Sequence, residues 1–238
     1  MVDTKELCGA DTGRGLNQTT ASGKPFWVGD PRPEDVRIED IAAQLSRICR
    51  FGGALKDGEG GFSYGSWGQY NYSVYEIYSV AQHCVLVSRN VPPEYALEGL
   101  LHDAAEAYIG DMIKPIKSQL VPDWEAIDVG LSFAAVPRDL IAPAVGILKT
   151  LVPDYKRMER RVDAAIRARF GLPAEESEFI KVADYRAVLT EHRDLQNHDG
   201  TDWGTAKLPP FDEQIIPVLP SVARQMFLDR FNELYKGE

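Results

Sequence analysis

Two histidines and a set of acids in apolar, helix-patterned segments are the residues of this chain best suited to chemistry. The sequence holds only four histidines. His102 and Asp103 stand together in an apolar run that continues to Glu106 and Tyr108, and His83 stands in an apolar segment before it. Burying an imidazole without a partner is costly, and a metal ion would supply that partner. We therefore expect a metal site.

Four residues are the expected ligands of this metal. On one helix, His102 and Asp103 project about 100 degrees apart and can both reach an ion that lies across the helix. His83, on a preceding helix joined by a short turn that contains proline, would be the third ligand. Asp184, an acid within an otherwise apolar stretch, is the predicted fourth. Two imidazoles and two carboxylates suit Mn, Co, Zn, Fe or Mg, and they leave positions open for water and a phosphate oxygen.

Two more acids follow the His-Asp pair. Glu106 shares a helix face with His102 and could orient a metal-bound water or take its proton; the simpler alternative is a salt bridge. Asp111 follows Gly110 at the expected helix end. It could protonate a leaving oxygen, or it could only cap the next turn. The two acids are therefore candidate catalytic residues.

The remaining polar candidates are less specific. Lys114 and Lys117 come next along the chain, and either could hold phosphate or be a solvated surface charge. His192 and His198 lie at the charged end of a helical pattern. We expect both histidines to be solvated.

Helices must position these residues, because apolar residues recur at three- and four-residue steps along most of the chain. Ser79 with Gln82 three positions later matches a capping box, which predicts a helix start. Gly52-Gly53 should end an earlier helix and Gly110 a later one. Helices are expected over 33–51, 79–89 and 92–110, and around 123–133, 136–150, 154–170, 175–197 and 220–236. The predicted class is an all-α bundle.

Two segments break the helical pattern. Residues 1–30 have several glycines and threonines with little periodicity, which predicts a mobile arm that can dock late onto the rest of the protein. Residues 31–238 would then form one domain. Residues 52–78 interleave glycines with aromatic residues, which predicts a long loop or a hairpin. Its rings either pack on the domain or a neighbouring subunit, or stack on a ligand base.

The composition excludes several classes of protein. The formal net charge is −10 and the chain has no block of Lys and Arg, which argues against stable nucleic-acid binding. Three cysteines without a CxxC pair argue against a disulfide framework. No stretch is apolar enough to cross a bilayer, and the start lacks the apolar core of a signal peptide. We expect a cytoplasmic protein, in the host cytoplasm if the source is viral.

The order and spacing of the candidate residues resemble a known family. His83, then His102-Asp103 with Glu106, then Asp111, then Asp184, is similar to the pattern of the HD-domain metal-dependent phosphohydrolases. The resemblance is strongest to the bacterial 5'-deoxynucleotidases and the phage dATP triphosphohydrolases, and it covers roughly Asp30 to Leu195. It implies an HD-domain helical bundle with four metal ligands, in which the two acids serve the attacking water and the leaving group.

Arg50 and Phe51 extend the resemblance. They fall where these enzymes carry an Arg that contacts phosphate and an aromatic ring near the nucleoside. From the residues alone, Arg50 could equally be a cation at a helix C-terminus, favoured by the dipole. The 52–78 segment departs from the family, because it is much longer than the connection usual there.

The resemblance implies hydrolysis of the 5' phosphoester of a deoxynucleotide. A dNTP, especially dATP, would give deoxynucleoside and triphosphate, and a dNMP would give deoxynucleoside and phosphate. A homo-oligomer, dimer or larger, is expected, with no membrane or nucleic-acid partner. The alternatives are an alarmone hydrolase, which the Arg50-Phe51 match disfavours, and a catalytically silent nucleotide sensor, which would need neither Glu106 nor Asp111.

Overall fold

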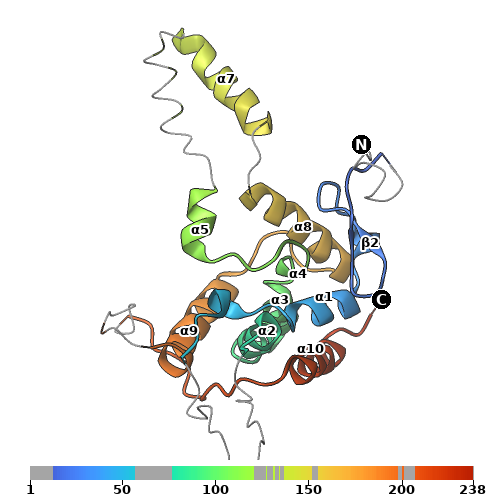
Figure 1. Ribbon diagram of the computed structural model, residues 1–238, viewed down its shortest axis with the longest axis vertical. Helices are drawn as coiled ribbons and strands as arrows, with labels where there is room; N and C mark the ends of the chain where they lie inside the picture. The colour runs from blue at the N-terminus through green and yellow to red at the C-terminus, as the bar shows by residue number, and fades with distance from the viewer. Residues whose placement is uncertain are drawn as a thin grey trace, which may run out of the picture. The chain divides into compact units, whose positions relative to one another are not determined.

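Helices make up most of the described part of the chain, which confirms the predicted all-α class. The computed structural model describes residues 13–56, 77–120, 127, 131, 134, 137–151, 155–197, 200 and 207–237. The chain divides into two compact units, one of Met1–Asp111 with Arg161–Glu238 and one of Met112–Arg160 (Figure 1). No described helix is both long and apolar enough to cross a membrane.

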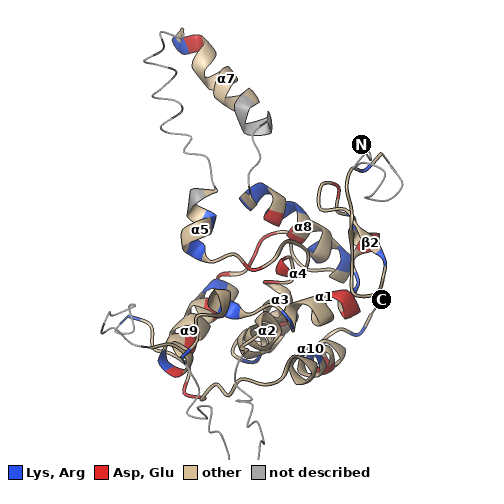
Figure 2. Cartoon of the chain, in the orientation of Figure 1, with Lys and Arg blue, Asp and Glu red and all other residues tan. Residues whose placement is uncertain are grey.

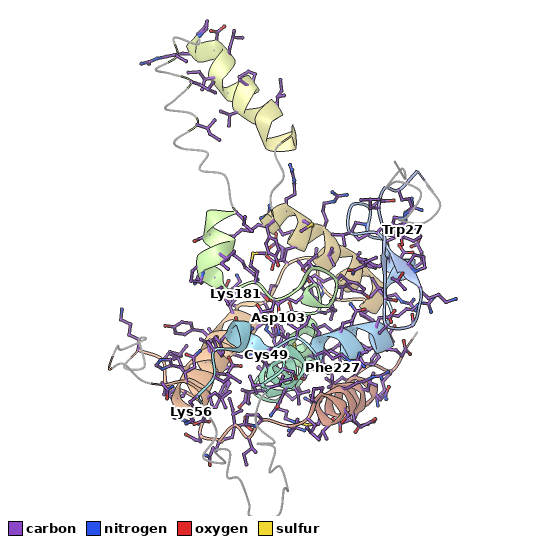
Figure 3. The ribbon with its side chains drawn as sticks, viewed as in Figure 1. Trp27, Cys49, Lys56, Asp103, Lys181 and Phe227 are labelled. Carbon is purple, nitrogen blue, oxygen red and sulfur yellow. The ribbon has the colours of Figure 1, made fainter. Side chains whose placement is uncertain are left out.

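In the first unit, helix α2 is the central element. It packs against α3, α9 and α10, while α1 packs against α4 and α10. Every residue of α2 except Arg89 is buried, and side chains such as Phe227 of α10 fill the space around it (Figure 3). The helices of this unit are α1 Ile38–Leu45, α2 Val80–Arg89, α3 Ala96–Leu101, α4 Glu106–Ile109, α9 Glu178–Leu195 and α10 Pro220–Leu234, with the short 3-10 turns η2 Pro33–Asp35, η3 Arg50–Gly53 and η4 Pro93–Tyr95.

The second unit contains α5 Lys114–Gln119, α7 Arg138–Leu151 and the beginning of α8 Tyr155–Phe170, which ends in the first unit. Helices α7, α8, α9 and α10 confirm the later helices that the sequence predicts. Most of the helix expected around 123–133 lies outside the described residues. Lys, Arg, Asp and Glu are distributed over many of the helices (Figure 2).

The described part of the predicted N-terminal arm, residues 13–30, contains a small hairpin. Strand β1 Gln18–Thr19 pairs antiparallel with β2 Pro25–Phe26, with Gln18 opposite Phe26. Phe26 is fully buried and stacks on Tyr108 of α4, with ring centroids 3.7 Å apart. Arg14 donates to Asp30 at 2.9 Å and pairs with Asp35. The described part of this arm therefore packs onto the helices.

The helix expected over 33–51 is shorter than predicted, because α1 ends at Leu45. The backbone that follows bonds across the chain instead of along a helix. Cys49 forms an antiparallel bridge with Ser79, Arg50 N–H donates to the Tyr78 carbonyl at 2.9 Å, and Val80 N–H donates to Ile48 at 3.0 Å. These backbone bonds therefore hold both ends of the 52–78 segment. The prediction of a loop falls mainly on residues 57–76, which lie outside the described residues.

The helix expected over 92–110 is also interrupted. Helix α3 ends at Leu101, residues 102–105 form a turn, and α4 begins at Glu106. In the turn, Ala104 N–H bonds to the Leu101 carbonyl at 3.0 Å and Glu106 N–H to the Asp103 carbonyl at 3.0 Å. These bonds span three residues and tighten the backbone. The His-Asp pair therefore lies in a break between two helices, and the predicted single helix is wrong.

The predicted start of α2 is confirmed. The Ser79 side chain accepts from Gln82 N–H at 3.3 Å, as a capping residue does. The Gln82 side chain does not complete the capping box, because it bonds to the backbone of Ile216 and Val218. The cap places His83 in the first turn of α2.

Candidate metal centre

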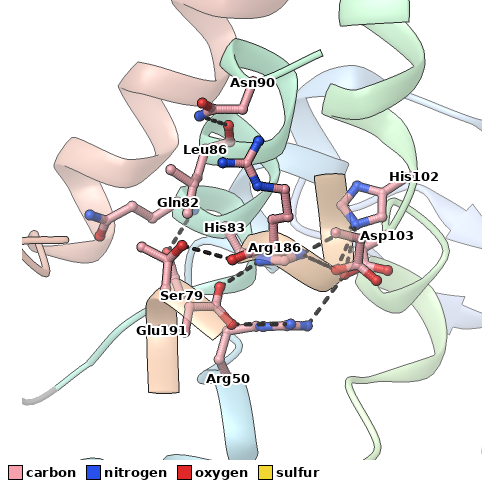
Figure 4. A network of polar contacts seen from close by, with 12 residues as sticks. Arg50, Ser79, Gln82, His83, Leu86, Asn90, His102, Asp103, Arg186 and Glu191 are labelled. Atoms are coloured by element: carbon pink, nitrogen blue, oxygen red, sulfur yellow. Dashed lines mark hydrogen bonds and ion pairs between the residues drawn. The ribbon is translucent and has the colours of Figure 1, made fainter. Parts of the chain in front are cut away.

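The four predicted metal ligands come together in the first unit. His83 Nε2 and His102 Nε2 lie 3.2 Å apart. Asp103 Oδ2 lies 3.5 Å from the first nitrogen and 3.4 Å from the second, and Asp184 Oδ1 lies 3.1 Å and 3.7 Å from them. His83, His102 and Asp103 form a group that could hold a metal ion. Figure 4 shows the two imidazoles directed at the same carboxylate.

The outer nitrogen of each imidazole faces an acceptor. His83 Nδ1 lies 2.6 Å from Glu191 Oε1, and His102 Nδ1 lies 2.9 Å from the Gly99 carbonyl. These partners assign the proton of each neutral ring to Nδ1, because a carboxylate or carbonyl only accepts. Both Nε2 atoms then present lone pairs to each other and to two carboxylate oxygens. With both rings neutral, four acceptors converge, and either a bound cation or protonation of the imidazoles balances them.

The distances among His83, His102 and Asp103 fit one divalent ion. Nitrogen and oxygen ligands bind such ions at about 2.0–2.2 Å, which places neighbouring ligand atoms of a tetrahedral or octahedral site roughly 3.0–3.6 Å apart. Three of the four histidine–carboxylate distances and the distance between the imidazoles fall in this range, and the fourth, His102 to Asp184, is 3.7 Å. His83, His102 and Asp103 therefore fit a metal ion, whereas Asp184 lies outside the group whose ligand atoms are all within 4.8 Å of one another.

The cluster is buried on its histidine side and more open on its carboxylate side. The side chains of His83 and His102 are 0% and 3% exposed, whereas those of Asp103 and Asp184 are 22% and 41% exposed among the described residues. Catalytic metal sites keep an open position for water or substrate, whereas structural sites are closed. The gradient in exposure favours a site that a small ligand can enter.

The charges of the cluster shift the pKa values of its members. Burial alone would lower the pKa of His102, but Asp103 and Asp184 raise it well above its ordinary value. Burial would raise the pKa of Asp184, but hydrogen bonds from the two histidines hold it far below its ordinary value. The carboxylates therefore stay ionised and attract positive charge to the cluster.

Arg50 adjoins the cluster from η3. Its Nη1 lies 3.4 Å from Asp103 Oδ2 and its Nη2 lies 3.4 Å from Glu191 Oε2. Burial would lower the pKa of the guanidinium, but Glu191 and Asp103 raise it well above its ordinary value, so Arg50 stays charged. Because α1 ends at Leu45, Arg50 is not a cation at the end of that helix. Phe51 beside it has the left-handed backbone angles φ 57 and ψ 23, which are uncommon for a bulky residue.

One candidate catalytic acid, Glu106, acts on Arg50, and the other, Asp111, acts on Cys49. Glu106 is buried at the start of α4, and its negative charge is one of those that raise the pKa of Arg50. Asp111 is half-buried after Gly110, whose φ is 82. Burial raises the pKa of the Cys49 thiol, and the charge of Asp111 raises it further. The negative charge of Asp111 is therefore felt at Cys49, the residue before Arg50 in the chain.

The two candidate lysines belong to the second unit. Lys114 is exposed at the start of α5. Lys117 Nζ donates to Glu159 Oε1 at 3.0 Å and lies 5.6 Å from the centre of the Tyr155 ring. Phosphate binding by either lysine stays a prediction.

Sequence reasoning missed Glu191 and misjudged its neighbour. The expectation of a solvated His192 is wrong, because its exposure is only 9%, and Glu191 is fully buried. His198 lies outside the described residues. One signal could have found Glu191: it stands seven residues after Asp184 on α9, and residues two helical turns apart share a face.

Comparison with known proteins places the chain among uncharacterized bacterial relatives. No family model matches it. It is 30% identical over 164 residues to an uncharacterized protein of Rhodobacter capsulatus, which covers 66% of this chain and 59% of that protein. It is 38% identical over 217 residues to the uncharacterized protein YfdR of Escherichia coli, which covers 90% of this chain and 93% of that protein. The chain belongs to the YfdR family.

Proposed function

We propose that this protein is a metal-dependent phosphohydrolase of the HD-domain type that cleaves the 5' phosphoester of deoxynucleotides. The observation that carries the proposal is the convergence of His83 Nε2, His102 Nε2 and the oxygens of Asp103 and Asp184. Such a set fits a divalent ion, and its carboxylate side is open to a ligand. The resemblance in sequence supplies the substrate class.

His83, His102, Asp103 and Asp184 would hold the ion, which is Co, Mn, Zn or Mg. When bound, it polarises a phosphoryl oxygen and lowers the pKa of water. Arg50 stays charged beside Asp103 and offsets the negative charge of the phosphate. Phe51 follows it and would face the nucleoside.

The reaction is the transfer of a phosphoryl group to water. The water oxygen attacks phosphorus, Glu106 orients this water and accepts its proton, and the bond between phosphorus and the 5' oxygen breaks. The electron pair of that bond stays on the 5' oxygen, and Asp111 donates a proton to it. A monophosphate gives deoxynucleoside and phosphate, and a triphosphate cut at the same bond gives deoxynucleoside and triphosphate.

The experiment is a panel of deoxy- and ribonucleoside mono-, di- and triphosphates and an alarmone, each incubated with the chain and Mn, Co, Zn or Mg. Chromatography then separates nucleoside, phosphate and triphosphate. We expect release of a deoxynucleoside from at least one deoxynucleotide. Binding of nucleotides without release from any of them would contradict hydrolysis and favour a silent sensor, and cleavage of the alarmone alone would contradict the substrate class.

Arg50→Lys tests the phosphate role within the same assay. We expect it to raise KM, because Lys cannot reproduce the planar, bidentate contacts of a guanidinium with phosphate. Arg47→Lys is the matched control, since the side chain of Arg47 bonds to the Ala43 carbonyl at 2.9 Å rather than to the cluster. Equal effects of the two changes would argue against the role of Arg50.

A further inference from the structure

Glu191 is a fully buried carboxylate that uses both of its oxygens. Oε1 lies 2.6 Å from His83 Nδ1, and Oε2 lies 3.4 Å from Arg50 Nη2. Figure 4 shows it between these two side chains. An acid with 0% exposure is costly to bury unless it is paired. Its partners here are a candidate metal ligand and the candidate phosphate-binding residue. Burial would raise the pKa of Glu191, but these partners and the Tyr78 hydroxyl lower it.

The three partners come from separate elements. His83 belongs to α2, Arg50 to η3 and Glu191 to α9. Helix α9 also carries Asp184, so one helix provides a candidate ligand directly and holds another one through Glu191. The carboxylate therefore joins the elements that form the site, from the side away from the more exposed acids.

We propose that Glu191 is a positioning residue that couples the metal centre to Arg50, holding His83 with one oxygen and Arg50 with the other. This inference rests on the proposed function, because it assumes that His83 binds a metal and Arg50 a phosphate. Carboxylates bonded to the outer nitrogen of a metal-bound histidine fix its tautomer and orientation and raise its basicity as a ligand. Glu191 has this relation to His83.

The contacts of Arg50 leave it able to bind a third anion. Both of its ion-pair distances are 3.4 Å, longer than the roughly 2.7–2.9 Å of tight charge-assisted hydrogen bonds. Its buried Nε has no hydrogen-bond acceptor among the described residues. Glu191 and Asp103 therefore orient the guanidinium without saturating it.

The test measures two affinities of the full-length chain without requiring turnover. Co²⁺ is titrated into metal-free protein and followed by its visible absorption, and inorganic phosphate is titrated into the cobalt-loaded protein by calorimetry. Glu191→Gln keeps the size and an acceptor for His83 but removes the charge. Asp40→Asn is the matched control, because Asp40 is 1% exposed and accepts from Thr20 and Ser22 at 2.6–2.9 Å, away from His83.

We expect Glu191→Gln to weaken cobalt binding by about tenfold to a hundredfold and Asp40→Asn to leave it nearly unchanged. We also expect Glu191→Gln to change the phosphate affinity of the otherwise wild-type chain. In a chain that already carries Arg50→Gln, the effect of the same substitution on phosphate affinity should be smaller by about threefold or more, because the effects of coupled residues are not additive. Cobalt affinity that stays at the wild-type value in Glu191→Gln overturns the link to His83. Equal effects on phosphate in both backgrounds overturn the link to Arg50.

Failure of the proposed function gives a different result. A wild-type chain that binds cobalt and phosphate but releases no nucleoside contradicts hydrolysis. The cobalt and phosphate affinities of Glu191→Gln then still test the role of Glu191. A wild-type chain that binds no cobalt overturns both proposals.

A measurement on the wild-type chain covers the case in which Glu191→Gln does not fold. The zinc-loaded protein is labelled with ¹⁵N in its four histidines, and their ring nitrogens are observed by NMR. A short hydrogen bond to Glu191 predicts a strongly downfield proton on Nδ1 of His83. A proton on Nε2 of His83 instead would overturn the proposal.

Discussion

His83 and His102 differ from ordinary buried histidines in what both of their nitrogens face. A structural histidine donates with one nitrogen and accepts with the other. Here the outer nitrogens already donate to Glu191 and to the Gly99 carbonyl, while the inner ones meet two carboxylates. This convergence of ligand atoms is the physical basis for proposing a metal ion.

Glu106→Gln separates catalysis from metal binding. Glu106 is buried near Arg50 and, in our proposal, acts on water without holding the ion. We expect turnover of the substrate found in the nucleotide panel to fall by about a hundredfold or more, while cobalt affinity stays nearly unchanged. Steady-state kinetics and a cobalt titration measure the two effects.

The control for this change is Asp40→Asn, which should leave turnover per folded molecule unchanged. Loss of cobalt binding in Glu106→Gln would mean that Glu106 is itself a ligand. Unchanged turnover would remove it from the mechanism.

The sequence indicated the candidate ligands because each stands as a polar residue within an apolar pattern. Glu191 escaped, since it begins the charged run Glu191-His192-Arg193-Asp194, which is typical of a solvated helix end. Its surroundings come from distant chain: Phe211 N–H bonds to Thr190 Oγ1 at 2.8 Å, and Tyr78 packs in the same apolar cluster as Phe211. Local patterns carry no information about such contacts.

Among the elements, the packing of α2 against α3 decides how far apart the two histidines lie. Gly99 of α3 faces the backbone of Ser88, and a Cβ at this position would lie 3.2 Å from Ser88 Cα. The Gly99 carbonyl also accepts from His102. The close approach of the helices therefore needs a glycine.

Gly99→Ala should destabilise the protein. Overpacking against backbone costs about 1–3 kcal/mol, which exceeds the gain of up to about 1 kcal/mol from better helix propensity. Gly146→Ala in α7 is the control, because a Cβ there would meet nothing within 4 Å. Thermal unfolding should give a lower Tm for the first variant and an equal or higher Tm for the second. A raised Tm in both would contradict the close approach.

Asp194 of α9 bonds to the segment that contains Ile215. It accepts from Arg193 at 2.7 and 2.9 Å and from Ile215 N–H at 2.8 Å. Partial burial would raise the pKa of this carboxyl, but these hydrogen bonds lower it below its ordinary value. Its stabilisation is therefore present above the unfolded pKa of about 3.9 and is lost as the pH falls through the lower folded pKa.

Asp194→Asn should lower the free energy of unfolding at neutral pH by about 1–2 kcal/mol. The difference from wild type should shrink below about pH 4, where the wild-type carboxyl becomes protonated. Urea unfolding at several pH values measures it. A difference that does not change with pH would show that the charge of Asp194 has no part in stability.

The helices predicted from the sequence fail where long-range contacts compete with local periodicity. The start of α2 follows from its cap, which is a local signal. The helix expected over 33–51 breaks because Ile48 and Arg50 bond to Val80 and Tyr78. The helix over 92–110 breaks at His102, where the backbone tightens into a turn. Both breaks lie at the candidate site, where the local pattern is overridden.

For the molecule as a whole, the N-terminal hairpin is part of the fold of the first unit. Phe26 is fully buried against Tyr108 of α4, which follows the turn that carries His102 and Asp103. Gln18 also donates to the Tyr108 carbonyl at 3.0 Å. The hairpin therefore supports the elements that position the site.

Phe26→Ala should lower the free energy of unfolding by about 3–5 kcal/mol, as for other buried aromatic residues. Leu16→Ala is the control, because Leu16 is 69% exposed, and it should change stability by no more than about 0.5 kcal/mol. Urea unfolding measures both. Equally small effects would show that the packing of Phe26 does not stabilise the first unit.

The binding of Co²⁺ to the metal-free chain tests most directly the central claim that the cluster binds a metal ion. After removal of metals with a chelator, titration with Co²⁺ should saturate at one ion per chain. His102→Gln should abolish this binding, whereas His192→Gln, the same change at another buried histidine, should leave it intact. A wild-type chain that binds no cobalt, or a His102→Gln variant that binds it as well as wild type does, would contradict the account.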